Sequence, residues 1–152
     1  MATAFVSSVI DAPIGKVWKR VRDFNAMPAW HPAIADSVIE EGLRSDTVGC
    51  VRSFNLTSWG RCQERLVALS DETHSFTYRI VAAPLPVQNY LATLVLYEVD
   101  SARTCGKWSA EFDVPIEKKD EMVKFIEGVF QAGFDSLQKK LGPQRFEYYP
   151  SY

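Results

Sequence analysis

The sequence predicts one α+β domain in which a curved antiparallel sheet of seven strands wraps around a long C-terminal helix. Strand-like segments separated by short turns follow one another from Ala33 to about Val114. Residues 117–141 carry an apolar stripe at helical spacing. The length of 152 residues suits a single domain with a core of its own. Since short turns can only join antiparallel neighbours, the strands are expected to form a meander.

The first elements are a strand and two short helices. Residues 3–10 form a β-branched run typical of a strand. Asp11 is expected to cap the next helix, with Pro13 in its first turn. Its apolar face has spacings of three and four and consists of Ile14, Val17, Trp18, Val21 and Phe24. A second, shorter helical turn is predicted near residues 25–29.

The remaining elements are six strands and the long helix. The strands are predicted at residues 34–40, 48–56, 61–69, 74–82, 87–99 and 104–113. The stripe of the long helix contains Met122, Phe125, Ile126, Val129, Phe130, Phe134, Leu137 and Leu141. Gly142 and Pro143 end the helix, so we take 1–141 as the domain and 142–152 as an aromatic tail. A frayed terminus, packing on a partner and a cover for a pocket mouth are the alternatives for this tail.

Composition excludes several classes of partner. The formal net charge is -2, from 17 Lys+Arg and 19 Asp+Glu, and no basic cluster predicts a nucleic-acid footprint. No stretch approaches the roughly 20 apolar residues of a membrane span. The first residues, MATAFVSSVIDAPI, lack the basic start of a signal peptide. The odd set of cysteines, Cys50, Cys62 and Cys105, has no metal-type spacing and predicts reduced thiols in a cytoplasmic protein.

Histidine usage argues against a metal site. His31 and His74 are the only histidines, and neither has a ligand partner nearby in the sequence. We therefore expect neither a metal nor another cofactor. His31, between Trp30 and Pro32, is expected at the surface or at a pocket rim.

Two charged residues break the apolar faces of neighbouring strands. Side chains alternate with a period of two, so even positions in 48–56 and in 61–69 share one face of each strand. These positions hold Val48, Cys50, Arg52, Phe54 and Leu56, then Cys62, Glu64, Leu66 and Ala68. A three-residue hairpin loop around Ser58–Gly60 places Arg52 opposite or diagonal to Glu64, whereas one residue more or less separates them.

The inward pair has two interpretations. Arg52 and Glu64 form a structural ion pair, or they form the polar base of an aromatic cavity. In the second case Arg52 binds an anionic or carbonyl oxygen and Glu64 moves a proton, while Tyr90 donates a hydrogen bond. The candidate wall residues are Trp30, Phe54, Leu66, Phe76, Tyr78, Ala92, Trp108, Phe112, Phe130 and Phe134. A half-open barrel around a helix encloses such pockets, which take small apolar ligands.

Almost the whole chain resembles the START-like helix-grip superfamily, in its polyketide cyclase/dehydrase (SRPBCC) group. The supporting segments are IDAPIGKVWKRVRDF, WHPAIADSVIEEG, VGCVRSFNL, ERLVALSDETHSFTYRIV, NYLAT and WSAEFD. Within the superfamily the chain is similar to lachrymatory factor synthases and, more distantly, to plant abscisic-acid receptors. Three residues of the synthases align with residues of this chain. The Arg of their Gly-Cys-Val-Arg motif aligns with Arg52, the Glu before their Leu-Val-Ala-Leu run aligns with Glu64, and a pocket Tyr aligns with Tyr90.

The resemblance implies a helix-grip fold with an internal cavity and a cofactor-free enzyme. The implied chemistry is acid–base isomerisation, cyclisation or dehydration of a small hydrophobic substrate with a polar head group. One alternative is a carrier or sensor of a small lipophilic ligand. Another is a protein whose pocket is filled by its own side chains and whose partner is another protein. A homodimer is compatible with each of these functions. The segment between Arg52 and Glu64 is short, and LTSWGRC replaces the receptors' Ser-Gly-Leu-Pro-Ala gate, so neither the synthase's substrate nor hormone sensing is expected.

Overall fold

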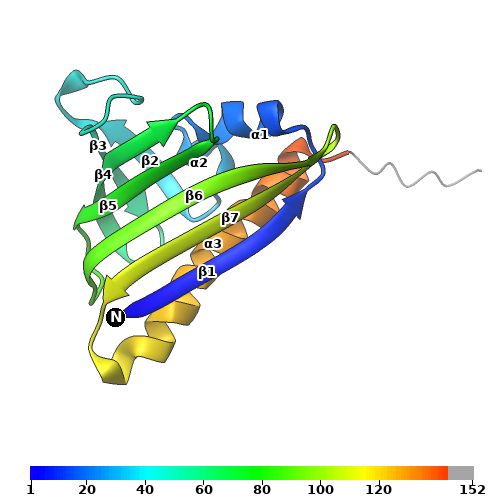
Figure 1. The fold of residues 1–152 in the computed structure, drawn as a ribbon. Helices are drawn as coiled ribbons and strands as arrows, with labels where there is room; N and C mark the ends of the chain where they lie inside the picture. Colours follow the sequence, from blue (N-terminus) through cyan, green and yellow to red (C-terminus); the bar gives the residue numbers. More distant parts are fainter. Residues whose placement is uncertain (144–152) are drawn as a thin grey trace, which may run out of the picture.

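The computed structural model describes residues 1–143, whose elements follow the predicted order (Figure 1). The strands are β1 (Ala2–Ile10), β2 (Ile34–Ile39), β3 (Val51–Leu56), β4 (Gly60–Ser70), β5 (Ser75–Ala82), β6 (Gln88–Asp100) and β7 (Arg103–Asp113). The helices are α1 (Ile14–Val21), α2 (Met27–Trp30) and α3 (Lys119–Leu141), with 3-10 turns at Glu40–Gly42 and Ile116–Lys118. The predicted aromatic tail, apart from Gly142 and Pro143, lies outside the described residues.

The seven strands of residues 1–143 form one antiparallel sheet in the order β1-β7-β6-β5-β4-β3-β2. Strands β2 to β7 each pair with the next strand along the chain, and β1 forms the other edge by pairing with β7. Figure 1 shows the sheet curving around α3, with α1 and α2 at one side. Inward side chains of the sheet meet the buried stripe of α3, so the core lies between these two layers. The predicted α+β helix-grip architecture is confirmed.

The entry into α1 differs from the prediction. Its N-cap is Pro13, which makes no side-chain capping bond, and not Asp11. Asp11 binds α3 instead: its backbone N–H donates to Gln138 Oε1 at 2.7 Å, and its Oδ2 accepts from Gln138 Nε2 at 3.1 Å. Because this carboxylate is engaged by α3, it fastens the β1–α1 connection to the far end of that helix.

Two strand faces also differ from simple alternation. A bulge between Leu66 and Ala68 leaves Ala68 exposed and turns Leu69 toward Phe76 of β5. In β3, which begins at Val51 and not at residue 48, the outward Ser53 is buried because the Arg61 side chain folds over it and donates to its hydroxyl at 3.1 Å.

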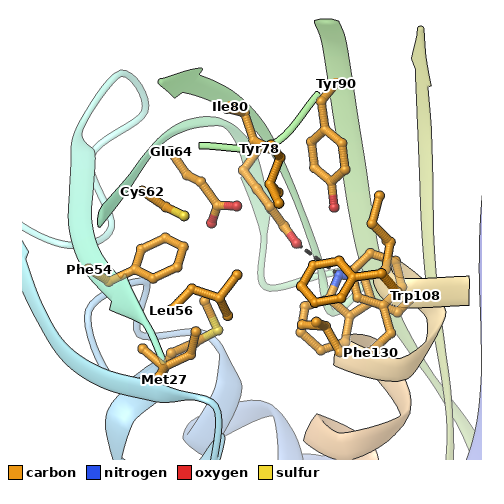
Figure 2. Close-up of a pocket in the computed structure, with 15 residues that line it drawn as sticks. Met27, Phe54, Leu56, Cys62, Glu64, Tyr78, Ile80, Tyr90, Trp108 and Phe130 are labelled. Carbon is orange, nitrogen blue, oxygen red and sulfur yellow. Dashed lines mark hydrogen bonds between the residues drawn. The ribbon is translucent and has the colours of Figure 1, made fainter. Parts of the chain in front are cut away.

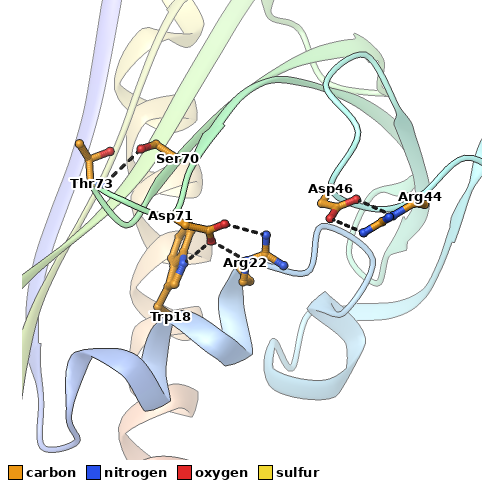
Figure 3. Close-up of polar contacts among 7 residues, drawn as sticks. All are labelled: Trp18, Arg22, Arg44, Asp46, Ser70, Asp71 and Thr73. Carbon is orange, nitrogen blue, oxygen red and sulfur yellow. Dashed lines mark hydrogen bonds and ion pairs between the residues drawn. The ribbon is translucent and has the colours of Figure 1, made fainter.

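A carboxylate in the β4–β5 turn holds α1 in place (Figure 3). Asp71 Oδ1 accepts hydrogen bonds from Trp18 Nε1 at 2.8 Å and from Arg22 Nε at 2.7 Å. These bonds, Arg22 first, lower the pKa of Asp71. Figure 3 also shows the separate Arg44–Asp46 ion pair in the loop before β3. The Asp71 contact fixes the end of α1, from which the chain runs directly to Phe24.

Gly133 of α3 permits a close approach of that helix to the aromatic core. A Cβ at this position would lie 2.9 Å from His31 Cδ2, 3.0 Å from Trp108 Cζ3 and 3.1 Å from Trp30 Cζ3. A Cβ at Gly128 of the same helix would meet nothing within 4 Å.

We therefore expect the two glycines to respond oppositely to alanine. Gly133→Ala should lower the free energy of unfolding by about 1–3 kcal/mol, because packed rings must move. Gly128→Ala should raise it by up to about 1 kcal/mol through helix propensity alone. Urea unfolding of both variants measures the difference, and stabilisation by Gly133→Ala would show that the contact is not close.

Candidate functional site

Arg52 and Glu64 are directly opposite each other on the β3–β4 hairpin. Leu56 pairs with Gly60, so the loop is Thr57–Trp59, and its three residues bring Arg52 into register with Glu64. Both side chains point inward, with exposed fractions of 1% for Arg52 and 9% for Glu64. The predicted inward pair is confirmed, including the three-residue loop on which it depends.

The Arg52 guanidinium is enclosed on every side. Its Nε donates to Glu64 Oε1 at 2.9 Å, and its Nη2 lies 2.7 Å from the same oxygen. Its Nη1 donates to the Phe24 carbonyl at 3.2 Å. The rings of Phe24 and Tyr78 flank the group, with centroids 3.8 and 4.8 Å from Cζ. Arg52 is therefore a buried cation that pairs with Glu64 and does not line the adjoining cavity.

Glu64 has one oxygen held and one oxygen available. Arg52 engages Oε1, whereas no group within residues 1–143 donates a hydrogen bond to Oε2. Figure 2 shows the carboxyl group directed into the space between the sheet and α3. Burial raises the pKa of Glu64, and the charge and hydrogen bond of Arg52 act in the opposite direction. A carboxyl group with a raised pKa is suited to exchange protons nearer neutral pH.

Two tyrosine hydroxyls face the same space (Figure 2). Trp108 Nε1 donates to the Tyr78 hydroxyl at 3.0 Å, so the proton of that hydroxyl is free to be donated onward. Tyr90 lies beside Tyr78, with ring centroids 6.4 Å apart. Burial raises the pKa of both phenols, so both remain protonated hydrogen-bond donors at neutral pH.

These groups border a cavity of about 50 Å³ with a wall that is otherwise almost entirely apolar. Strands β2 to β7 supply one wall and α3 the other, and Met27 of α2 and Leu85 of the β5–β6 loop also line the cavity. Trp108 and Phe130 are stacked across the two layers, with centroids 4.4 Å apart and planes at 8°. The lining residues are Met27, Ile34, Phe54, Leu56, Cys62, Glu64, Tyr78, Ile80, Leu85, Tyr90, Trp108, Phe125, Ile126, Val129 and Phe130.

The structure brings only some of the candidate site residues to this cavity. Those that line it are Phe54, Glu64, Tyr78, Tyr90, Trp108 and Phe130. Those that are buried elsewhere are Trp30, Arg52, Leu66, Phe76, Ala92, Phe112 and Phe134. Phe76, for example, packs against Trp18 and Phe24 beneath α1, and Phe134 fills the space above Gly106.

Sequence reasoning missed several lining residues. Leu56 and Cys62 lie on strand faces that alternation predicts to point inward, Ile80 alternates in step with the predicted wall residues Phe76 and Tyr78, and Ile126 and Val129 lie within one turn of Phe130. These five therefore had a usable signal. Leu85, in the β5–β6 loop, and Met27, in a four-residue helix, had none.

His31 is a buried core residue that does not line the cavity, contrary to the predicted position at the surface or at a pocket rim. Its Nδ1 accepts from the Ala33 backbone N–H at 3.1 Å, so Nε2 carries the proton and donates to the Val129 carbonyl at 2.7 Å. Gly133 provides the room for the imidazole against α3. Burial lowers the pKa of His31, and the Arg52 charge lowers it further.

This buried imidazole should make folding sensitive to acid. Because the folded state disfavours the protonated ring, the contribution of His31 is present above its ordinary pKa of 6.5 and is lost as the pH falls through the lowered value. We expect His31→Gln to be less stable than wild type at neutral pH, with a smaller further loss on acidification. Urea unfolding over a pH series tests this, and an identical pH dependence in both proteins would contradict it.

The site offers neither a metal centre nor an activated thiol within residues 1–143. No cluster of three or more His, Cys, Asp or Glu side chains there has a metal-binding arrangement. Cys62 lines the cavity, but burial raises the pKa of its thiol to about 11, so it stays protonated. All three cysteines are free. No helix in residues 1–143 combines the length and apolar character needed to cross a bilayer.

Comparisons with known proteins agree with this architecture. The abscisic acid receptor PYL10 of Arabidopsis thaliana is 31% identical over 135 residues, which cover 84% of this chain and 73% of the receptor. The solved structure of XoxI from Bacillus cereus superposes with a TM-score of 0.84 at 30% identity, covering 93% of this chain and 96% of XoxI. Norcoclaurine synthase from Thalictrum flavum shares the fold, with a TM-score of 0.71 at 16% identity over 91% of this chain and 92% of the synthase.

The family profile covers nearly all of the described chain. The profile described as "Polyketide cyclase / dehydrase and lipid transport" matches residues 1–142. This match includes the β3–β4 hairpin that carries the ion pair and every residue that lines the cavity. The chain therefore belongs to the polyketide cyclase/dehydrase (SRPBCC) family of hydrophobic ligand-binding domains.

Proposed function

We propose that the protein is a cofactor-free enzyme in which Glu64 transfers protons to and from a small hydrophobic substrate with a polar head group. One observation carries the proposal: a buried carboxyl group is held at Oε1 by Arg52, receives no hydrogen bond at Oε2 from the described residues, and lines an apolar cavity. Tyr78 and Tyr90 add two hydroxyl donors to the same cavity. A base and hydrogen-bond donors around one small space are the requirements for removing a proton from carbon.

The proposed reaction begins with the substrate oxygen at the tyrosine hydroxyls. Glu64 takes a proton from the neighbouring carbon, and the negative charge that develops on the oxygen is stabilised by Tyr78 and Tyr90. Return of the proton to another carbon gives isomerisation, and its delivery to a leaving hydroxyl gives dehydration and water. Attack of the carbanion on a second carbonyl of the same molecule opens that C=O bond, and return of the proton to the resulting alkoxide completes a cyclisation. The same three side chains, those of Glu64, Tyr78 and Tyr90, act in each of these reactions, and the structure of the substrate determines which reaction occurs.

Arg52 is a positioning residue in this scheme. The residue does not line the cavity, so the expected direct contact with a ligand oxygen is not part of the proposal. Its charge opposes the effect of burial on Glu64 and keeps a fraction of the carboxyl group ionised as a base. Its two contacts to Oε1 also orient Oε2 toward the substrate.

A non-catalytic carrier of a small lipophilic ligand is the second candidate. The observation in its favour is that Arg52 and Glu64 already form an ion pair with each other, beside a cavity wall that is otherwise almost entirely apolar. A carrier would bind the same molecules without any proton transfer.

Hydrogen–deuterium exchange of butanone in D₂O tests the proposal. The full chain should accelerate exchange at the carbons next to the carbonyl, as followed by proton NMR. Tyr90→Phe removes one donor and should slow the enzymatic rate by about 10²–10³-fold. Tyr97→Phe, on the exposed outer face of β6, is the matched control and should exchange at the wild-type rate. Saturable binding without exchange would favour the carrier, and exchange that is insensitive to Tyr90→Phe would exclude the proposed donor.

A further inference from the structure

We infer that the ligand of this cavity is a neutral molecule of only a few non-hydrogen atoms, and that carboxylates and long acyl chains are excluded. The inference rests on the proposed function in one respect, which is that the cavity beside Glu64 is the ligand site. Two independent properties of the cavity carry it, namely the charge of its wall and its volume.

The charge of the wall disfavours anions. None of the described lining residues is Lys, Arg or His, and the one carboxyl group among them belongs to Glu64. The nearest cation, Arg52, already contacts Glu64 Oε1 and the Phe24 carbonyl, and the Phe24 and Tyr78 rings cover its faces. A carboxylate in the cavity would lose its hydration and face Glu64 without a counter-charge, which is costly.

A neutral oxygen, by contrast, finds partners in the wall. The Tyr78 hydroxyl receives its own hydrogen bond from Trp108, which leaves its proton for a ligand or for Tyr90. Such a donor suits a carbonyl or hydroxyl oxygen without requiring a charge on the ligand. A small ketone, aldehyde or alcohol therefore matches the polar part of the cavity.

The volume limits the size of the ligand. The cavity measures about 50 Å³, whereas an engineered protein cavity that binds benzene measures about 150 Å³ and a single water needs roughly 10–15 Å³. On this scale about two to five non-hydrogen atoms fill the space. Trp108 cannot easily move aside, because it stacks on Phe130, donates to Tyr78 and contacts Trp30.

A matched trio of probes tests both limits on the full chain. Butanone and propanoate have the same number of non-hydrogen atoms and similar shapes, but only propanoate is charged at neutral pH. The third probe, 2-nonanone, keeps the ketone and lengthens the chain. Titrations followed by protein ¹H–¹⁵N NMR should show saturable shifts with butanone, and binding at least tenfold weaker with each of the other two.

Removing the negative charge should reverse the charge selectivity. In Glu64→Gln the buried Arg52 charge is no longer balanced, so propanoate should bind at least tenfold more tightly than it binds wild type. The inference is overturned if wild type binds propanoate or 2-nonanone as tightly as butanone, or if butanone does not bind. The wild-type comparison decides the matter even if the variant fails to fold.

These outcomes separate the inference from the proposed function. Binding of butanone without deuterium exchange would contradict the proposed enzymatic activity and would leave the inference about the ligand intact. If the protein catalyses deuterium exchange of 2-nonanone but not of butanone, proton transfer would be supported and the size limit would be overturned.

Discussion

Arg52→Met should destabilise the protein by about 3–5 kcal/mol, because it leaves a buried carboxyl group without its partner. Arg52 supplies both contacts to Glu64 Oε1, and it also satisfies the Phe24 carbonyl. Methionine fills much of the same volume but can do neither. Urea unfolding of the variant at neutral pH measures the loss.

The pH dependence identifies the cause of this loss. Without Arg52, only burial acts strongly on Glu64, so its pKa rises further and the folded state binds a proton more readily than the unfolded state. Stability is then greatest at low pH and falls as the pH rises through the ordinary value of 4.5 toward the raised value. The destabilisation should therefore be smaller in acid than at neutral pH.

Two further variants complete the test. Arg52→Met combined with Glu64→Leu removes both charges and should recover much of the stability. Arg103→Met breaks the half-exposed Arg103–Asp100 pair and should change stability little. If Arg52→Met were as mild as Arg103→Met, the pair would not be the buried, closely coupled unit described above.

Glu64→Gln should slow deuterium exchange of butanone by about 10²–10⁴-fold, because glutamine cannot accept the proton. The amide oxygen can still accept from Arg52, so the side chain keeps its size and one of its contacts. In wild type the rate should fall as the pH drops through the raised pKa of Glu64, since only the ionised form is a base. This acidic limb should lie above pH 4.5, the ordinary value.

Glu98→Gln provides the matched control for this prediction. Glu98 is an exposed glutamate on β6 that does not line the cavity, and its replacement should leave exchange unchanged. Equal exchange by Glu64→Gln and wild type would show that Glu64 does not move the proton.

The sequence was sufficient for the fold and for the ion pair because both follow from local periodicity. Alternation in β3 and β4, with a three-residue loop, determines that Arg52 and Glu64 share a face and a register. Periodicity does not report how far along the sheet each inward residue lies relative to α3. This is why Phe76 and Phe134, though correctly inward, pack away from the cavity.

The features that were not predicted depend on contacts between distant segments. His31 is buried because Gly133, on a different element, leaves space for its ring. The bulge after Leu66 turns Ala68 outward, and no residue type in that strand signals it. Arg52 fails to reach the cavity because Phe24 and Tyr78 enclose it, an arrangement that requires α1 and β5 to be in place.

A ¹³C NMR titration of the Glu64 carboxyl carbon, with and without butanone, tests whether this group is a buried base in contact with the ligand. We expect a midpoint above 4.5 in the free protein, and a further change of midpoint and chemical shift when butanone occupies the cavity. A midpoint at or below 4.5 that butanone leaves unchanged would contradict this expectation, since Glu64 would then be an ordinary ion-pair carboxylate without contact to a ligand.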